Sequence, residues 1–201
     1  MGNARIRATL FLLPWAACFL LGCGKDPRPA DPVEQPVVRP KSEPLKVGDP
    51  LPELVVEGWL NGPPPASGPE TRLRVTDVWA AWCPYCRQSA PGLSRVQARF
   101  APQGVQFVSI TNMPRQSTQA MTDQMKITWP SGFGLSDGSV FALHADSGMV
   151  APGYEVAPVL YITGPDNRIR WLDDQGRLRH KEPDAWEREL DTAIERLLRE
   201  P

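Results

Sequence analysis

Two cysteines that directly follow an apolar run are the feature that most constrains this chain. The run covers residues 75–81 (Val-Thr-Asp-Val-Trp-Ala-Ala), and the sequence continues Trp82-Cys83-Pro84-Tyr85-Cys86. Cysteines at this spacing can close a disulfide with little rearrangement of the chain. If Cys83 stands at the N-terminus of a helix, the free backbone N–H groups and the helix dipole favour its thiolate. The arrangement suits thiol–disulfide exchange, although a metal site or a structural link can use the same residues.

The first 23 residues have the pattern of a bacterial lipoprotein signal. Two arginines precede an apolar stretch over residues 8–21, which is shorter than the roughly 20 residues needed to span a bilayer. The stretch ends in Leu20-Leu21-Gly22-Cys23, which resembles the lipobox of bacterial lipoproteins. This resemblance implies cleavage after residues 1–22, loss of Cys18 and lipid modification of Cys23. We therefore expect a lipid-anchored protein on the extracytoplasmic face of the cell envelope. An ordinary secretion signal with two incidental cysteines is the alternative.

Residues 23–46 are expected to form a flexible tether. Between Gly24 and Pro50 there are seven prolines among charged residues, and large apolar residues are few. Such a segment cannot bury a core and favours extended polyproline II structure. At roughly 3 Å per residue, it would hold the following domain several nanometres from a membrane surface.

Residues 47–201 remain, and they are enough for one domain with a hydrophobic core. Without residues 1–22, which contain two arginines and no acid, 20 basic residues stand against 23 acidic ones, a net charge of −3. No basic stripe is present, so nothing indicates a nucleic-acid partner. Cys83 and Cys86 are the only thiols of this domain, which excludes a framework of structural disulfides.

The hydrophobic pattern of this domain predicts strands that alternate with helices. Short runs of β-branched and aromatic residues indicate strands, and apolar residues at helical spacing indicate helices. Pro84 suits a first helical turn, whereas Pro91 should kink the same helix. The expected strands are 53–60, 73–80, 105–110, 159–163 and 168–172; the expected helices are 83–100, 117–126 and 183–199; loops are expected at 61–68 and around Gly132, Gly134, Gly138, Gly148 and Gly153.

This order of elements resembles the thioredoxin fold, and more closely the TlpA/ResA-like group of membrane-associated thioredoxins. The resemblance covers residues 47 to about 198. It rests on Val47-Gly48-Asp49-Pro50-Leu51-Pro52, on residues 77–87 around the cysteines, on Pro91, and on Val156-Ala157-Pro158-Val159. It implies an α/β fold with a central mixed β-sheet flanked by helices. Val78 departs from the pattern, because an aromatic residue is usual there.

The resemblance also implies the role of each site residue. Cys83 would be the attacking thiol and Cys86 the resolving thiol, and the two would form a redox-active disulfide. Pro158 would be a cis-proline that faces them. Asp77 matches the buried acid of thioredoxins and would accept the proton that Cys86 loses when it attacks; alternatively, Asp77 is only a solvent-side residue of its strand.

A second group of residues is expected to contact the substrate. Trp82 would flank the cysteines as a contact surface, although simple packing of its ring is the alternative. Pro84 and Tyr85 lie between the two thiols in sequence. The small Ala157 would expose its backbone to a substrate strand next to Pro158, and its size would tune both substrate fit and thiol reactivity.

Other chemistry is less well supported by the residues present. A Cys-x-x-Cys pair can be half of a zinc site, yet His144 and His180 are the only histidines and a second cysteine pair is absent. Cys83, Cys86 and His144 could bind copper in a thioredoxin-like metallochaperone, although such chaperones usually space their cysteines by three residues. A peroxidase would need a lone peroxidatic cysteine in a threonine-containing loop, and the typical form of that loop is absent from the sequence. We expect no cofactor and no resident metal.

The resemblance thus implies a thiol–disulfide oxidoreductase in the reductase direction. Its partners would be exported proteins with thiols or disulfides, such as the apocytochromes of cytochrome c maturation, and a membrane thiol electron donor that re-reduces Cys83 and Cys86. A dithiol oxidant of exported proteins is the alternative within the enzyme class.

Overall fold

The computed structural model describes residues 45–64, 66, 70–139, 159–173 and 183–200, all within a compact unit of residues 40–201. Within these ranges, none of the helices combines the length and the hydrophobicity that a membrane span requires. The elements are β1 (Gly58–Leu60), β2 (Leu73–Val78), α1 (Pro84–Phe100), a 3₁₀ turn (Ala101–Gln103), β3 (Val105–Ile110), α2 (Arg115–Met125), β4 (Ser131–Phe133), β5 (Val159–Thr163), β6 (Ile169–Asp173) and α4 (Pro183–Arg199).

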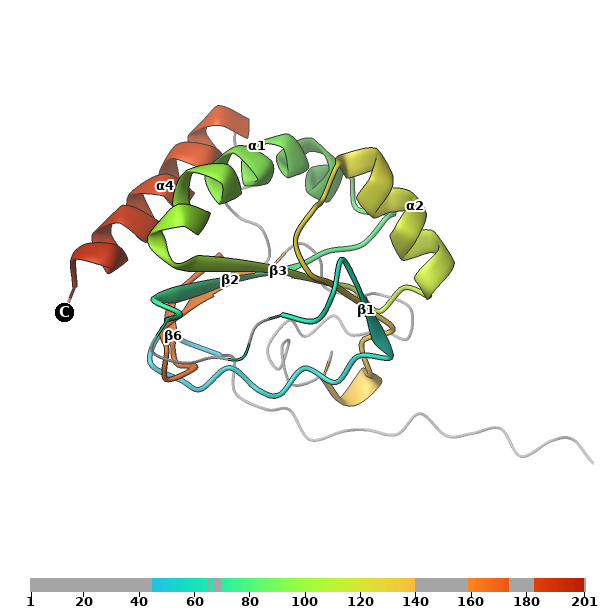
Figure 1. The fold of residues 1–201 in the computed structure, drawn as a ribbon, viewed down its shortest axis with the longest axis horizontal. Coiled ribbons are helices and arrows are strands. Elements are labelled where there is room, and N and C mark those ends of the chain that lie inside the picture. The colour runs from blue at the N-terminus through green and yellow to red at the C-terminus, as the bar shows by residue number, and fades with distance from the viewer. Residues whose placement is uncertain (1–44, 65, 67–69, 140–158, 174–182, 201) are drawn as a thin grey trace, which may run out of the picture. The chain divides into compact units, whose positions relative to one another are not determined.

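Six strands form one mixed sheet in the order β1-β4-β3-β2-β5-β6. The β2–β3 and β3–β4 pairs are parallel, and the other three pairs are antiparallel. The two parallel crossovers step along the sheet in the same direction, so the right-handed rule puts α1 and α2 on the same face. Figure 1 shows α1, α2 and α4 together on that face. The mixed sheet predicted from the sequence is confirmed.

The larger core lies between the sheet and the pair α1 and α4. Apolar residues at helical spacing point inward from both helices, as expected for amphipathic helices on a sheet. Each fully buried large side chain contributes roughly 1.5–3 kcal/mol of burial free energy. The core contains Leu93, Val96 and Phe100 of α1, Trp186, Leu190 and Ile194 of α4, and Leu73, Val75, Phe107, Leu160 and Ile162 of the sheet.

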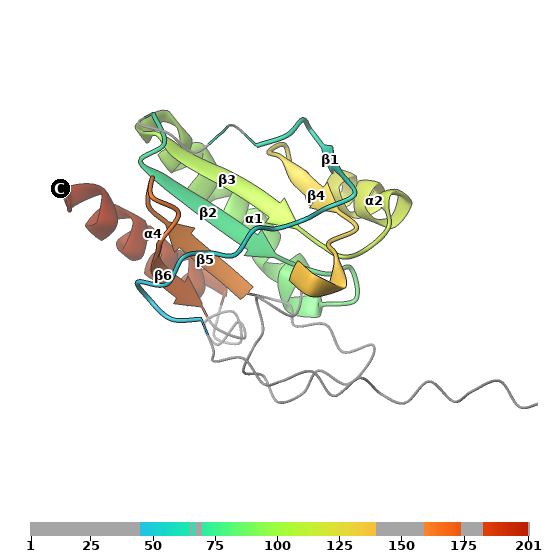
Figure 2. The same cartoon turned by 90° about the horizontal axis from the view of Figure 1, so that it is seen from below.

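The opposite face of the sheet is covered by residues 45–57, which cross it as an extended segment (Figure 2). Leu51 is buried there, and Leu54 and Val56 pack against the same cluster. The predicted strand 53–60 is therefore wrong over most of its length, since only residues 58–60 join the sheet. The upstream residues use their apolar side chains to cover the sheet instead of pairing with its edge.

Strand β4 lies where the sequence analysis expects a glycine-rich loop, and that expectation is wrong for residues 131–133. Close packing leaves little room for a side chain at Gly132. A Cβ on Gly132 would lie 3.0 Å from the side chain of Val56 and 3.1 Å from the ring of Trp59. Gly134, directly after the strand, has a φ of +63°, which L side chains rarely adopt.

The remaining element boundaries agree with the predicted ones to within two residues. Strands β3 and β5 and helix α4 have the predicted bounds. Strand β2 ends at Val78, because the backbone beyond it turns toward the cysteines. Helix α2 begins two residues early, at Arg115, and β6 is shifted by one residue. Pro91 lies inside α1, where it has no N–H to donate to the carbonyl of Arg87.

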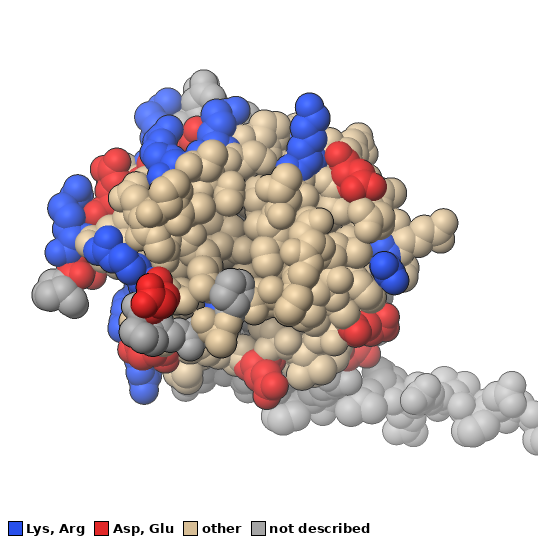
Figure 3. Space-filling model, viewed as in Figure 1, with Lys and Arg blue, Asp and Glu red and all other residues tan. Residues whose placement is uncertain are grey.

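Two ion pairs join the exposed sides of α1 and α4, where side chains of both signs gather (Figure 3). The Arg95 Nε donates to Glu187 Oε1 over 3.0 Å, and Arg99 pairs with Asp191. The Arg95 hydrogen bond is the main cause that lowers the pKa of Glu187 below its usual value. Burial is the main cause that raises the pKa of Asp191, against the attraction of Arg99.

Candidate redox site

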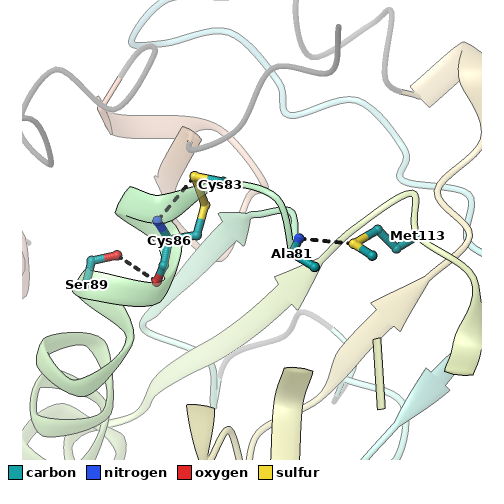
Figure 4. The surroundings of a disulfide bond; sticks show 5 residues. All are labelled: Ala81, Cys83, Cys86, Ser89 and Met113. Atoms are coloured by element: carbon teal, nitrogen blue, oxygen red, sulfur yellow. Dashed lines mark hydrogen bonds between the residues drawn. A yellow bond between two sulfur atoms is a disulfide. The ribbon is translucent and has the colours of Figure 1, made fainter. Parts of the chain in front are cut away.

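Cys83 caps the N-terminus of α1 and forms a disulfide with Cys86 in the first turn of that helix. Their Cα atoms are 5.4 Å apart. The Cys86 backbone N–H donates to the Cys83 Sγ over 3.2 Å, as Figure 4 shows. Pro84 occupies the first helical position, where a missing N–H costs nothing. The helix end predicted for Cys83 is therefore present, with one of its free N–H groups directed at the sulfur.

Both cysteines are buried in a small apolar cluster, with exposed fractions of 1% for Cys83 and 4% for Cys86. Trp79 and Ala80 complete the buried part of this cluster. Two effects oppose each other here: apolar surroundings disfavour a thiolate, whereas the helix N-terminus favours it. The Cys86 N–H that contacts the Cys83 sulfur is placed to stabilise a thiolate there once the disulfide is reduced. Half-buried Ala81, Tyr85, Met121 and Met125 pack around the cluster.

The loop that leads from β2 to Cys83 is fastened at three backbone N–H groups. The N–H of Trp79 donates to the carbonyl of Ile110 over 3.0 Å, and the N–H of Cys83 donates to the carbonyl of Ala80 over 3.1 Å. Between them, the N–H of Ala81 donates to the thioether sulfur of Met113 over 3.0 Å (Figure 4). Two of these three acceptors lie at or just beyond the end of β3.

Asp77 is buried on the helix-covered face of β2. Side chains alternate along a strand, so Asp77 shares its face with Val75, which belongs to the core beneath α1 and α4. Asp77 is 5% exposed and pairs with Ser109 on β3 and with Leu160 on β5. The alternative of a solvent-side residue is therefore wrong. The role of Asp77 in proton transfer stays a prediction.

Three of the residues predicted to contact substrate lie in the described segment around the buried cysteines. Trp82 is 53% exposed and Pro84 is exposed, whereas Tyr85 is half-buried against the cysteine cluster. Because about half of its surface is covered, both substrate contact and simple packing stay open for Trp82. Contact between these residues and a substrate stays a prediction.

Several predicted residues lie outside the described ranges. Ala157 and Pro158 belong to this group, together with His144, His180, Cys18 and Cys23. The residue after Pro158, Val159, opens β5 and pairs with Val78 on β2. Within the described part of the chain, no three His, Cys, Asp or Glu side chains come together in a group that could hold a metal ion.

Sequence reasoning missed two residues that contact the loop and helix turn around the cysteines. Met113 accepts the Ala81 N–H from a position 32 residues away in the sequence. The Ser89 hydroxyl, which is buried, donates to the Cys86 carbonyl over 3.3 Å. A periodic pattern at Ser89 places it on the inner face of α1. No sequence signal identifies Met113, because its hydrogen bond with Ala81 depends on the path of the loop between β3 and α2.

The fold and the site together define a thioredoxin-fold protein of the thiol–disulfide oxidoreductase class. The chain belongs to the AhpC/TSA family, whose model matches residues 66–172. Among curated proteins, FixW of Rhizobium leguminosarum is 26% identical over 74 residues, which cover 37% of this chain and 34% of FixW.

Solved structures show the same fold at low sequence identity. A putative protein disulfide isomerase from Bacteroides thetaiotaomicron has a TM-score of 0.59 at 15% identity, and covers 78% of this chain and 92% of its own. Peroxidoxin BcpB from Mycobacterium tuberculosis has a TM-score of 0.56 at 17% identity, with 76% and 97% covered. A thiol:disulfide interchange protein from Bacteroides sp. has a TM-score of 0.53 at 18% identity, with 74% and 90% covered. The predicted thioredoxin fold and family resemblance are confirmed.

Proposed function

We propose that this protein is an extracytoplasmic, membrane-tethered thiol–disulfide oxidoreductase that reduces disulfides of exported proteins. The observation that carries the proposal is the Cys83–Cys86 disulfide at the N-terminus of α1, with the Cys86 N–H on the Cys83 sulfur. A pair that closes within one helical turn can pass between dithiol and disulfide with little movement of the fold. Solved structures of the same fold carry the name thiol:disulfide interchange protein, which agrees with this chemistry.

In the proposed reaction, the reduced protein transfers two electrons to a substrate disulfide. The Cys83 thiolate attacks one substrate sulfur, which forms a mixed disulfide and releases the other sulfur as a thiolate. Cys86 then loses its proton and attacks the Cys83 sulfur, which releases the second substrate thiolate and leaves the Cys83–Cys86 disulfide. The two substrate thiolates take up protons. A membrane thiol donor must return two electrons before the next cycle.

Asp77 is the proposed base for the second step. Cys86 is buried, so its proton has no direct path to bulk water in the described structure. Asp77 lies on the strand that leads to the cysteines, on the face that α1 covers. A carboxylate beneath this helix can accept the proton, directly or through one water.

The substrate is proposed to dock where the buried cysteines are bordered by exposed residues. Trp82 offers a large aromatic surface beside Cys83, and Pro84 is exposed at the start of α1. Ala157 and Pro158 would supply backbone groups for an extended substrate segment. Aromatic anchors of this kind typically dominate the free energy of protein–protein contacts.

The membrane attachment is proposed to come from Cys23 after removal of residues 1–22. The supporting observations are the Leu20-Leu21-Gly22-Cys23 sequence and the proline-rich residues 23–46. Metabolic labelling with a radioactive fatty acid tests this part: the chain should be labelled, and the Cys23→Ser variant should not. Labelling of both, or of neither, would contradict the lipid anchor.

The reduction potential of the Cys83–Cys86 pair tests the direction of electron flow. Equilibration with glutathione buffers should give a value near that of thioredoxin, about −270 mV. A value near about −120 mV, as in strongly oxidising dithiol proteins, would contradict a reductase and support a dithiol oxidant. A pair that does not exchange with glutathione at all would contradict both directions.

A copper titration tests the metallochaperone alternative. The reduced protein is titrated with copper(I) beside its His144→Ala variant. Submicromolar binding that is lost in the variant would support the metallochaperone and contradict the proposed oxidoreductase. Copper binding that is equal in the wild type and in His144→Ala would contradict the metallochaperone alternative, because that alternative requires His144 as the third ligand.

A further inference from the structure

We propose that Met113 is a positioning residue for Cys83: its thioether sulfur fixes the loop that presents the attacking thiol. The carrying observation is the hydrogen bond from the Ala81 N–H to the Met113 sulfur, 3.0 Å long. Met113 does not act on the substrate in this proposal. It acts through Ala81, which precedes Cys83 by two residues.

This hydrogen bond supplies an acceptor for a backbone N–H within the turn that leads to Cys83. A backbone N–H that is partly buried needs an acceptor, and most such groups find a carbonyl. The loop turns sharply at residues 80–83, where the Cys83 N–H bonds to the Ala80 carbonyl. At Ala81 the acceptor is a side chain from the loop between β3 and α2, at the same edge of the sheet. A thioether is a weak acceptor, so the sulfur has to be well placed to serve.

The backbone of Met113 is held on both sides, which makes its side chain a stable support. Its N–H donates to the Thr111 hydroxyl over 3.3 Å. Its carbonyl accepts from the Gly134 N–H over 2.9 Å and from the Thr118 hydroxyl over 3.3 Å. These partners come from the end of β3, from the segment after β4 and from α2. The backbone from which the Met113 side chain extends is therefore held by the sheet and by α2, independently of the cysteine turn.

The position of Ala81 matters for the thiol because the cysteine turn follows immediately. Cys83 must stay at the helix N-terminus for its sulfur to accept the Cys86 N–H. Loss of the Met113 acceptor would let residues 80–82 shift toward water to satisfy the Ala81 N–H. The Cys83 sulfur would then spend less time on the Cys86 N–H, and its thiolate would be less favoured.

The test compares three variants of the full-length reduced protein: Met113→Leu, Met113→Gln and Met121→Leu. Leucine keeps the apolar volume and removes the acceptor, whereas glutamine restores an acceptor of similar reach. Met121 packs against the same cysteine cluster with no hydrogen bond of its sulfur among the described contacts, so it controls for packing. The readout is the rate of iodoacetamide alkylation of Cys83 against pH, followed in the tryptic peptide of residues 75–87, where fragment masses distinguish a label on Cys83 from one on Cys86.

Met113→Leu should move the midpoint of the Cys83 alkylation profile upward by about 0.5 to 1 pH unit, which is a roughly three- to tenfold slower reaction below the midpoint. Met113→Gln and Met121→Leu should retain the wild-type profile. An unchanged profile for Met113→Leu would overturn the inference, and so would an equal shift for Met121→Leu. If Met113→Leu does not fold, the glutamine variant decides, because a displaced profile there would also overturn it.

The inference rests on the proposed role of Cys83 as the attacking thiol, but the two can fail separately. Alkylation measures the thiolate of Cys83 without any protein substrate. A reduction potential in the oxidant range would overturn the proposed direction of electron flow and leave the Met113 result untouched.

Discussion

Val78 and Val159 pair across β2 and β5, and this pair places the start of β5 beside the end of the strand that leads to Cys83. Val78 ends the strand that leads to Cys83, and Val159 is the residue that follows Pro158. The two segments are far apart in sequence, yet their backbones are hydrogen-bonded neighbours in the sheet. That Pro158 faces the cysteines stays a prediction from the family resemblance.

Replacement of the resolving thiol should trap substrates on the protein. In Cys86→Ala, Cys83 can still form a mixed disulfide, but the step that releases the second substrate thiolate is absent. We expect disulfide-linked complexes on non-reducing gels that disappear on reduction. The matched control is Cys83→Ala, which lacks the attacking thiol. Equal trapping by both variants would contradict the assignment of Cys83 as the attacking residue.

Asp77→Asn should slow resolution of the mixed disulfide while formation of that disulfide keeps its rate. The amide has nearly the shape of the carboxylate but cannot accept the Cys86 proton, so we expect at least a roughly tenfold slower second phase. Stopped-flow tryptophan fluorescence with a model disulfide separates the two phases. Asp166→Asn, at an exposed turn, controls for the loss of one charge. A second phase of wild-type rate would remove Asp77 from the reaction.

Alanine variants of two tryptophans near the cysteines should distinguish an effect on substrate binding from an effect on stability. Trp82 is 53% exposed, so Trp82→Ala should change the free energy of unfolding by no more than about 0.5 kcal/mol and should raise the KM for protein disulfides. Trp79 is 2% exposed, and Trp79→Ala should cost about 3–5 kcal/mol. Denaturant unfolding and steady-state kinetics check both. An unchanged KM in Trp82→Ala would exclude that ring as a substrate contact.

Glu187 and Asp191 of α4 should make contributions to the free energy of unfolding that change in opposite directions with pH. The lowered pKa of Glu187 means that its contribution to stability is present above the unfolded-state pKa and is lost as pH falls through the folded one. The raised pKa of Asp191 means that its contribution is present at low pH and is lost as pH rises through the folded value. Relative to the wild type, Glu187→Gln should therefore lose stability between about pH 3 and pH 7, and Asp191→Asn should gain it.

The size of these effects should be small, about 0.2–1 kcal/mol for Glu187, because its partner Arg95 is exposed. Urea unfolding at both pH values measures each difference. Changes of the same sign in the two variants would contradict the opposite pKa directions.

The sequence predicted most of the helices and the central strands because their patterns are local. Residues 105–110 are β-branched and aromatic enough to read as a buried strand, and α4 carries an apolar stripe at helical spacing. Strand β4 was not predicted because Gly132 within it and Gly134 directly after it normally indicate a loop. The close packing of Val56 and Trp59 against Gly132, which favours a glycine inside the strand, is visible only in the structure.

For the site as well, the sequence predicted the local features and missed the long-range ones. A helix N-terminus at Cys83 follows from Pro84 and the apolar run before it, and both are visible in the sequence. The Met113 contact joins positions 32 residues apart, and its geometry depends on the register of β2 against β3. Hydrogen bonds to a thioether have no sequence signature, so this part of the site required the structure.

The support of Ala81 by Met113 also limits what can be transplanted from this protein. A graft of residues 79–87 into another thioredoxin-fold host would carry both cysteines, the helix cap and the aromatic neighbours. It would leave behind the sulfur beyond β3 that accepts the Ala81 N–H, together with the three groups that hold Met113. The smallest portable unit of this site therefore runs from β2 through α1, β3, α2 and β4 to Gly134, and residues 79–87 alone are an incomplete part of it.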